Sequence, residues 1–189
     1  MEVCVLIIVI LFFYLMFSGT TRNTRSDFVV SDIDNRVYLV KNGKNKKLSA
    51  NTLATINNNV LLLLNSLKKE SNEKVKNLLN RYNPDNLIEN IDSTGTSYVL
   101  NKGEEIGVCL STKDSKEEIY DTNTLMFVVI HELAHIGCDS YGKNSHDKEY
   151  IEFFSFLLKK AIQVGIYTYQ DYSMKPVEYC GIIINKTPV

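Results

Sequence analysis

Two histidines and a glutamate have the types and the spacing that a metal-dependent hydrolase needs. His131, Glu132 and His135 occur together in the segment HELAH. On an α-helix, residues four apart leave the same face about one turn from each other, so both imidazoles can bind one metal ion. Glu132 cannot easily be a ligand from the same turn, but its carboxylate can take a proton from a metal-bound water. The motif therefore predicts a catalytic site for one zinc ion.

His146 is the candidate for the third zinc ligand. The chain has three histidines, and catalytic zinc takes three protein ligands and keeps a fourth position open for water. Glu149 and Glu152 are the alternatives, and either would make a site of two histidines and one carboxylate. Asp147 is expected to be a capping or supporting acid rather than a ligand. Cys138 follows the motif closely but ranks below His146.

Hydrolysis of a peptide bond is the reaction that these residues predict. Zinc is expected to lower the pKa of its bound water, and Glu132 to accept the proton and later pass it to the leaving amine. The expected partner is a protein or peptide substrate. The alternative function is a catalytically silent, zinc-stabilised interaction module tethered to a membrane. Four tyrosines are candidates for stabilising the oxyanion, and the sequence does not choose among Tyr167, Tyr169, Tyr172 and Tyr179.

Two helices are expected to position the metal ligands. Asp121 can cap a helix from Thr122 to Ile136 that ends at Gly137, and the apolar run before the motif predicts that this helix is buried on both faces. A polar loop follows. Apolar residues at helical spacing then predict a second helix over Lys148 to Gln163, which begins beside His146 and returns antiparallel to the first.

The rest of the chain predicts an α+β fold, in which helices pack on a small, mainly antiparallel sheet. Lys102-Gly103 joins two apolar runs into a predicted hairpin, in which Ile106 to Cys109 either contacts the substrate backbone or only covers the core. Ser49 is the expected N-cap of the first helix. The predicted elements are strands at Phe28–Val30, Arg36–Lys41, Ser97–Asn101 and Glu105–Leu110, and helices at Ser49–Leu67 and Glu73–Tyr82.

The amino-terminal segment predicts a membrane anchor. Residues 3–17 carry no charged side chain, so residues 1–19 are expected to form one transmembrane helix, followed by a linker at 20–27 and a domain at 28–189. Arg22 and Arg25 follow the apolar run and place the domain on the cytoplasmic or virion-interior side. A cleaved signal peptide, which would lead to secretion, is the alternative.

Composition excludes some other classes. The net charge is −1 with 23% charged residues, so no basic surface for nucleic acid is indicated. The four cysteines include Cys4 in the apolar segment. Cys109, Cys138 and Cys180 remain, an odd number without a C-x-x-C pair, which favours reduced thiols over a disulfide framework. The sequence does not indicate an oligomeric state.

HELAH, the loop after it and the segment HDKEYIEFF resemble the WLM and SprT-like (Spartan-like) zinc metallopeptidases. In these families a third histidine, often written as HD, opens an aromatic-rich helix. The stretch through KPVEYCG also resembles uncharacterised metallopeptidase-like proteins of large DNA viruses, and the resemblance covers about residues 97–185. It implies a minimal zincin-like fold, one zinc ion and proteolysis of protein substrates. The spacing from His135 to His146 is longer than in WLM proteins.

Overall fold

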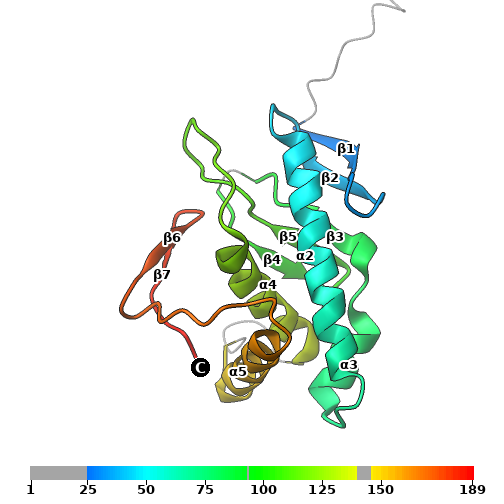
Figure 1. The fold of residues 1–189 in the computed structure, drawn as a ribbon, viewed down its shortest axis with the longest axis vertical. Helices are drawn as coiled ribbons and strands as arrows, with labels where there is room; N and C mark the ends of the chain where they lie inside the picture. The colour runs from blue at the N-terminus through cyan, green and yellow to red at the C-terminus, as the bar shows by residue number, and fades with distance from the viewer. Residues whose placement is uncertain (1–24, 93, 140–145) are drawn as a thin grey trace, which may run out of the picture.

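The computed structural model describes residues 25–92, 94–139 and 146–189, and this part of the chain has an α+β fold (Figure 1). The helices are α2 (Lys46–Leu67), α3 (Glu73–Arg81), α4 (Thr122–Gly137) and α5 (Lys148–Gln163), with a 3-10 turn η1 (Pro84–Asn86). The strands are β1 (Ser26–Val30), β2 (Val37–Lys41), β3 (Leu87–Glu89), β4 (Tyr98–Leu100), β5 (Glu105–Val108), β6 (Val177–Tyr179) and β7 (Ile182–Ile184).

A three-stranded sheet with the order β3-β5-β4 lies next to the helices. Its β4–β5 pair confirms the predicted hairpin, with Val99 opposite Ile106 in an antiparallel register. The sheet is mixed, because β3 pairs with β5 in parallel. β1 and β2 form a separate antiparallel hairpin. The strand β3 was not predicted, since three residues are too few to show an alternating pattern.

Helix α2 runs along the sheet and buries the apolar row that predicted it (Figure 1). Leu53, Ile56 and Val60 are fully buried on this face. The helix begins at Lys46 rather than after Ser49, so the prediction of Ser49 as the N-cap is wrong. Ser49 is itself buried within the first turns of the helix. A serine before an apolar row therefore does not settle where a helix begins.

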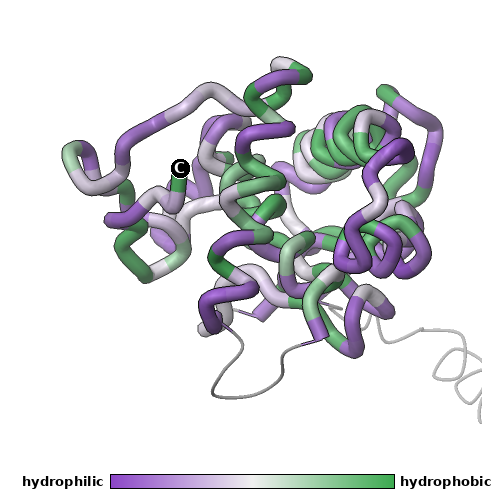
Figure 2. Tube along the Cα trace, turned by 90° about the horizontal axis from the view of Figure 1, so that it is seen from below, coloured by the Kyte–Doolittle hydropathy of each residue, from purple (hydrophilic) through white to green (hydrophobic). Residues whose placement is uncertain are grey.

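Helix α4 is surrounded by the rest of the core, as its apolar sequence predicts. The run Leu125–Ile130 is buried, and the helix packs against both α3 and α5. Asp121 accepts a hydrogen bond from the Thr124 amide at 2.9 Å, which confirms it as the N-cap. Figure 2 shows that hydrophobic and hydrophilic residues follow one another along the helices, as expected of helices that bury one side. A helix held from several sides keeps its side chains in fixed positions.

Gly137 allows α4 to approach both α3 and α5 at its carboxyl end. A Cβ atom there would lie 2.4 Å from the Phe153 ring and 2.7 Å from the Lys74 carbonyl oxygen. We expect Gly137→Ala to lower the free energy of unfolding by about 1–3 kcal/mol, because overpacking against backbone outweighs the better helix propensity of alanine. Urea-induced unfolding of both proteins measures this difference in unfolding free energy. Gly43→Ala is the control, since nothing lies within 4 Å of its added Cβ, and equal losses in both variants would contradict the prediction.

No helix in the part of the chain that the structure describes combines the length and the apolar character needed to cross a membrane. The longest, α2, has 22 residues, but Asn57, Asn58 and Asn59 interrupt its apolar row. This finding contradicts the prediction of a single-pass membrane protein with its domain on the cytoplasmic or virion-interior side. The apolar run 3–17, the predicted segment 1–19 and residues 20–24 of the predicted linker lie outside the described residues.

The prediction of reduced cysteines is also wrong, because Cys109 and Cys180 form a disulfide. The β6–β7 hairpin returns to the end of β5, where the two Cα atoms are 6.5 Å apart. The two cysteines are 71 residues apart in sequence, so only the fold brings them together. Cys138 is the remaining cysteine of the described residues, and it is a buried free thiol. The three cysteines that follow Cys4 are thus one disulfide-bonded pair and one buried free thiol.

Candidate metal centre

Three imidazoles converge where α4 faces the start of α5. The Nε2 atom of His146 lies 3.1 Å from that of His135 and 3.2 Å from that of His131. The candidate ligand atoms of the three residues all lie within 4.8 Å of one another. His131 and His135 leave the same face of α4, and His146 stands two residues before the first residue of α5. The fold thus brings together the three residues predicted as ligands.

The histidines are held in the form that binds metals. Burial and, to a smaller extent, the neighbouring imidazoles lower the pKa of His131 to about 3. Burial, the His146 imidazole and the Lys102 ammonium together lower the pKa of His135 to about 4. Burial also lowers the pKa of His146. A neutral imidazole has a free nitrogen lone pair, whereas a protonated one has none. The group is therefore ready to accept a cation at neutral pH.

Tyr150 supports the imidazoles from α5. Its ring stacks on His135 with centroids 4.4 Å apart, and its hydroxyl donates to the His131 carbonyl oxygen at 3.1 Å. Phe154, one turn later, contacts the edge of His131 at 5.3 Å. Sequence reasoning assigned these aromatic residues only to the packing between the helices. Their position at helical spacing after His146 is the signal that could have identified them.

Glu132 is buried beside the three histidines and lines the same cavity. Burial raises the pKa of its carboxyl group to about 8. A cation held by the histidines would favour the charged carboxylate, because opposite charges attract strongly away from water. The side chain is then a base that water reaches only through the cavity.

The residues considered as alternative third ligands form other interactions. Glu149 forms an ion pair with Lys74 at 3.1 Å, and Glu152 lies 3.7 Å from Lys148. Asp147 caps α5 by accepting a hydrogen bond from the Tyr150 amide at 2.8 Å, which agrees with its predicted capping role. Cys138 is not in the group of possible ligands found among the described residues.

A cavity of about 1080 Å³ opens onto the histidines. It is lined by β4, by α4 and α5, and by β7 with the residues that follow it. The strand β5 lies in the middle of the sheet, between β3 and β4. The prediction that Ile106 to Cys109 could contact a substrate backbone is therefore corrected, because β4 is the strand at the cavity and at the sheet edge.

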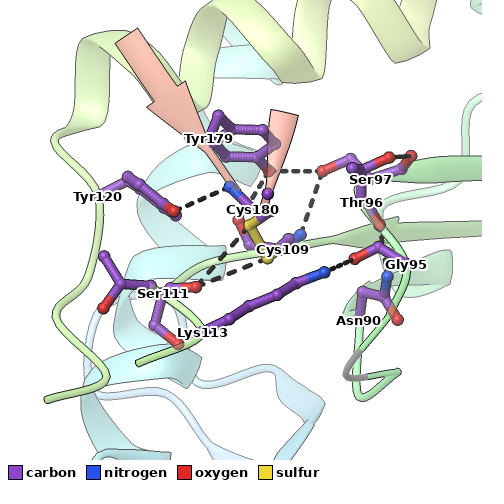
Figure 3. The surroundings of a disulfide bond; sticks show 12 residues. Asn90, Gly95, Thr96, Ser97, Cys109, Ser111, Lys113, Tyr120, Tyr179 and Cys180 are labelled. Atoms are coloured by element: carbon purple, nitrogen blue, oxygen red, sulfur yellow. Dashed lines mark hydrogen bonds between the residues drawn. A yellow bond between two sulfur atoms is a disulfide. The ribbon is translucent and has the colours of Figure 1, made fainter. Parts of the chain in front are cut away.

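Of the four candidate tyrosines, Tyr179 is the one that lines the cavity. Its hydroxyl donates to the Cys109 carbonyl oxygen at 2.7 Å and lies 2.6 Å from Ser97 Oγ (Figure 3). These contacts attach the β6–β7 hairpin to the sheet, so Tyr179 supports the wall of the cavity. Sequence reasoning missed this hairpin. Its signal was the alternation of Val177, Tyr179, Ile182 and Ile184 about Cys180-Gly181.

Comparison with known proteins identifies relatives in large DNA viruses. The chain is 36% identical over 186 residues to "Uncharacterized protein R325" of Acanthamoeba polyphaga mimivirus, which covers 95% of this chain and 91% of the relative. It is 38% identical over 106 residues to "Uncharacterized protein 042R" of Invertebrate iridescent virus 3, covering 56% and 60%. A third relative, "Uncharacterized protein 136R" of Invertebrate iridescent virus 6, is 38% identical over 72 residues, which is 38% of each chain. No family model and no solved structure matches.

Proposed function

We propose that the chain, which belongs to the same family as the mimivirus protein, is a zinc-dependent metallopeptidase. The observation that carries the proposal is the convergence of His131, His135 and His146 beside the buried carboxylate of Glu132, at one end of a large cavity. These are three ligands and one base at a place that a substrate can reach. The resemblance to viral proteins is confirmed, and the peptidase activity is our proposal.

The spacing of the nitrogens fits one tetrahedral zinc ion. Zn–N bonds of about 2.0–2.1 Å place two ligand nitrogens about 3.3 Å apart in a tetrahedron. The Nε2 separations of His146 from His135 and from His131, 3.1 and 3.2 Å, are close to this value. Hydrogen bonds among three neutral imidazoles would leave lone pairs facing one another, since each has a single N–H. A cation shared by all three nitrogens removes that conflict.

Glu132 would act as the general base and then the general acid. A bound zinc ion supplies a Lewis acid, which polarises a carbonyl group and lowers the pKa of water. The Glu132 carboxylate would accept a proton from the attacking water and return it to the leaving amine. Tyr150 would keep His131 and His135 in place through its hydroxyl and its ring. Each residue thus has a role that its position supports.

The arrangement of elements supports a minimal zincin-like fold of the kind that WLM and SprT-like peptidases imply. A sheet edge, β4, lies beside the helix α4 that carries HELAH, and α5 follows with the third histidine. An extended polypeptide can pair with a free strand edge through its backbone. We therefore propose that substrate binds along β4, with its scissile carbonyl at the histidines.

Metal analysis of the full-length protein tests the centre. We expect about one zinc ion per chain after dialysis, and we expect His146→Ala to weaken zinc binding by more than about 100-fold, since loss of a direct ligand exceeds the effect of losing a supporting group. Glu149→Ala and Glu152→Ala are matched controls that should keep zinc. Equal zinc affinity in His146→Ala and wild type would contradict the three-histidine site.

Turnover of an unfolded, fluorescently labelled protein tests the activity. We expect cleavage that a chelator stops and added zinc restores. A protein that holds one zinc ion and cleaves nothing would instead fit a catalytically silent, zinc-stabilised interaction module. Glu132 favours the peptidase, because a purely structural zinc site has no use for a buried base beside its ligands.

A further inference from the structure

The three consecutive isoleucines of β7 line the same cavity as the metal centre. We infer that two of them, Ile182 and Ile184, form a specificity subsite for a large apolar side chain of a polypeptide substrate, next to the scissile bond. This inference rests on the proposed peptidase function and adds the substrate class. Ile182 is 49% exposed, so a substrate side chain that covers it would remove apolar surface from water.

The register of the hairpin directs Ile182 toward the body of the protein. Ile182 lies opposite Tyr179 in the antiparallel pair, and cross-strand partners share one face. Tyr179 is buried and bonds to the Cys109 carbonyl oxygen, so this face looks toward the sheet. Ile184 is on the same face by alternation. Ile182 and Ile184 therefore face the side from which a substrate on β4 would approach.

The surrounding walls favour an apolar group over a charged one. Phe127 and Val128 of α4 and Phe154 of α5 line the same cavity. Its charged lining residues are two of each sign, Lys102 and Lys186 against Glu132 and Asp171. The Lys102 ammonium donates to the His135 carbonyl oxygen at 3.1 Å, so its charge is directed at the end of α4. Neither sign of charge therefore dominates the described lining of the cavity. A substrate side chain would then be selected by the apolar surface that it buries there.

The hairpin is fixed firmly enough to select. The Cys109–Cys180 disulfide joins its turn to the end of β5, and the Cys180 amide donates to the Tyr120 hydroxyl at 2.8 Å (Figure 3). The Gly181 amide donates to the Glu178 carboxylate at 2.7 Å, which closes the turn. A wall attached at several points keeps its shape when a side chain enters. A wall that is already in place needs no ordering when substrate binds, so more of the apolar contact energy is available to distinguish one substrate side chain from another.

An extended polypeptide suits the dimensions of the cavity. Its volume of about 1080 Å³ is at the upper end of sites for small ligands, which span roughly 300–1,000 Å³. A chain paired with β4 would direct alternate side chains to opposite faces. The substrate side chains on one of these faces would contact Ile182 and Ile184.

Cleavage of a proteome-derived peptide library by the full-length protein tests the inference. We expect wild-type cleavage sites to be enriched in Leu, Ile, Met and Phe at one position adjacent to the scissile bond. Ile182→Asp should reduce this enrichment by about 10-fold, since one methylene more or less in an apolar pocket already changes discrimination by about that factor or more. It should favour Lys or Arg there instead, because the new carboxylate attracts a positive charge. A gained preference cannot come from a misfolded protein.

Leu62→Asp is the matched control, because Leu62 is 56% exposed on α2 and does not line the cavity. It should leave the cleavage profile unchanged. Cleavage by the wild type without any apolar preference, or an unchanged profile in Ile182→Asp, would overturn the inference and leave the peptidase proposal standing. Absence of cleavage from a zinc-loaded protein would overturn both.

Discussion

Replacement of Glu132 by glutamine is expected to lower kcat by about 10²–10⁴-fold while zinc stays bound, because the amide has the shape of the carboxylate but cannot accept a proton. Glu132 is buried and lines the cavity beside the three histidines. The change removes a titratable group without opening a void, so the fold should be preserved. Initial rates on the labelled unfolded protein, together with zinc content, measure the two effects separately.

Glu152→Gln is the control for the loss of one negative charge. Glu152 is an exposed residue of α5 near Lys148, so this variant should keep wild-type kcat and zinc. If Glu132→Gln is as active as the wild type, another group must accept the proton and the proposed mechanism is wrong. If it loses zinc as well as activity, Glu132 is part of the metal site rather than a base beside it.

The metal helix was the most predictable part of the molecule. The helices α4 and α5 have nearly the bounds that the sequence predicts, because Asp121 has a capping side chain and because the apolar spacing of α5 is regular. The relative position of His131 and His135 was also predictable, since two residues four apart on an α-helix lie on the same face. Local signals of this kind act within one element, and they need no knowledge of the rest of the fold.

The parts that the sequence did not predict depend on contacts between distant segments. The β6–β7 hairpin consists of two three-residue strands, so its alternating pattern becomes visible only when both strands are read together about Cys180-Gly181. The disulfide pairs Cys109 with Cys180 across the fold, so counting cysteines misjudged it. The sequence also could not choose whether Ile106 to Cys109 contacts a substrate or only covers the core, because the parallel partner β3, which places β5 inside the sheet, comes from an earlier segment.

The cavity wall depends on this disulfide, and its removal is expected to have separate effects on stability and on the metal centre. We expect the double variant Cys109→Ser, Cys180→Ser to lose about 2–4 kcal/mol of unfolding free energy, since the bond closes a long loop in the unfolded chain. Its zinc content should not change, because the ligands lie on α4 and at the start of α5. Its kcat/KM should fall and its apolar preference weaken, because the hairpin that carries Ile182 loses its covalent attachment. Urea unfolding, metal analysis and the peptide library measure the three quantities.

A reducing agent provides the internal control for the disulfide. It should shift the wild-type unfolding midpoint toward that of the double variant and leave the double variant itself unchanged, although the buried thiol of Cys138 is present in both. Equal midpoints for oxidised and reduced wild type, with the bond shown by peptide mapping, would mean that the hairpin is held by its hydrogen bonds alone. These hydrogen bonds include those of Tyr179 to Cys109 and Ser97, and those of Tyr120 to Cys180 and Glu178. A loss of zinc on reduction would instead mean that the β6–β7 hairpin helps to hold the proposed metal centre in place.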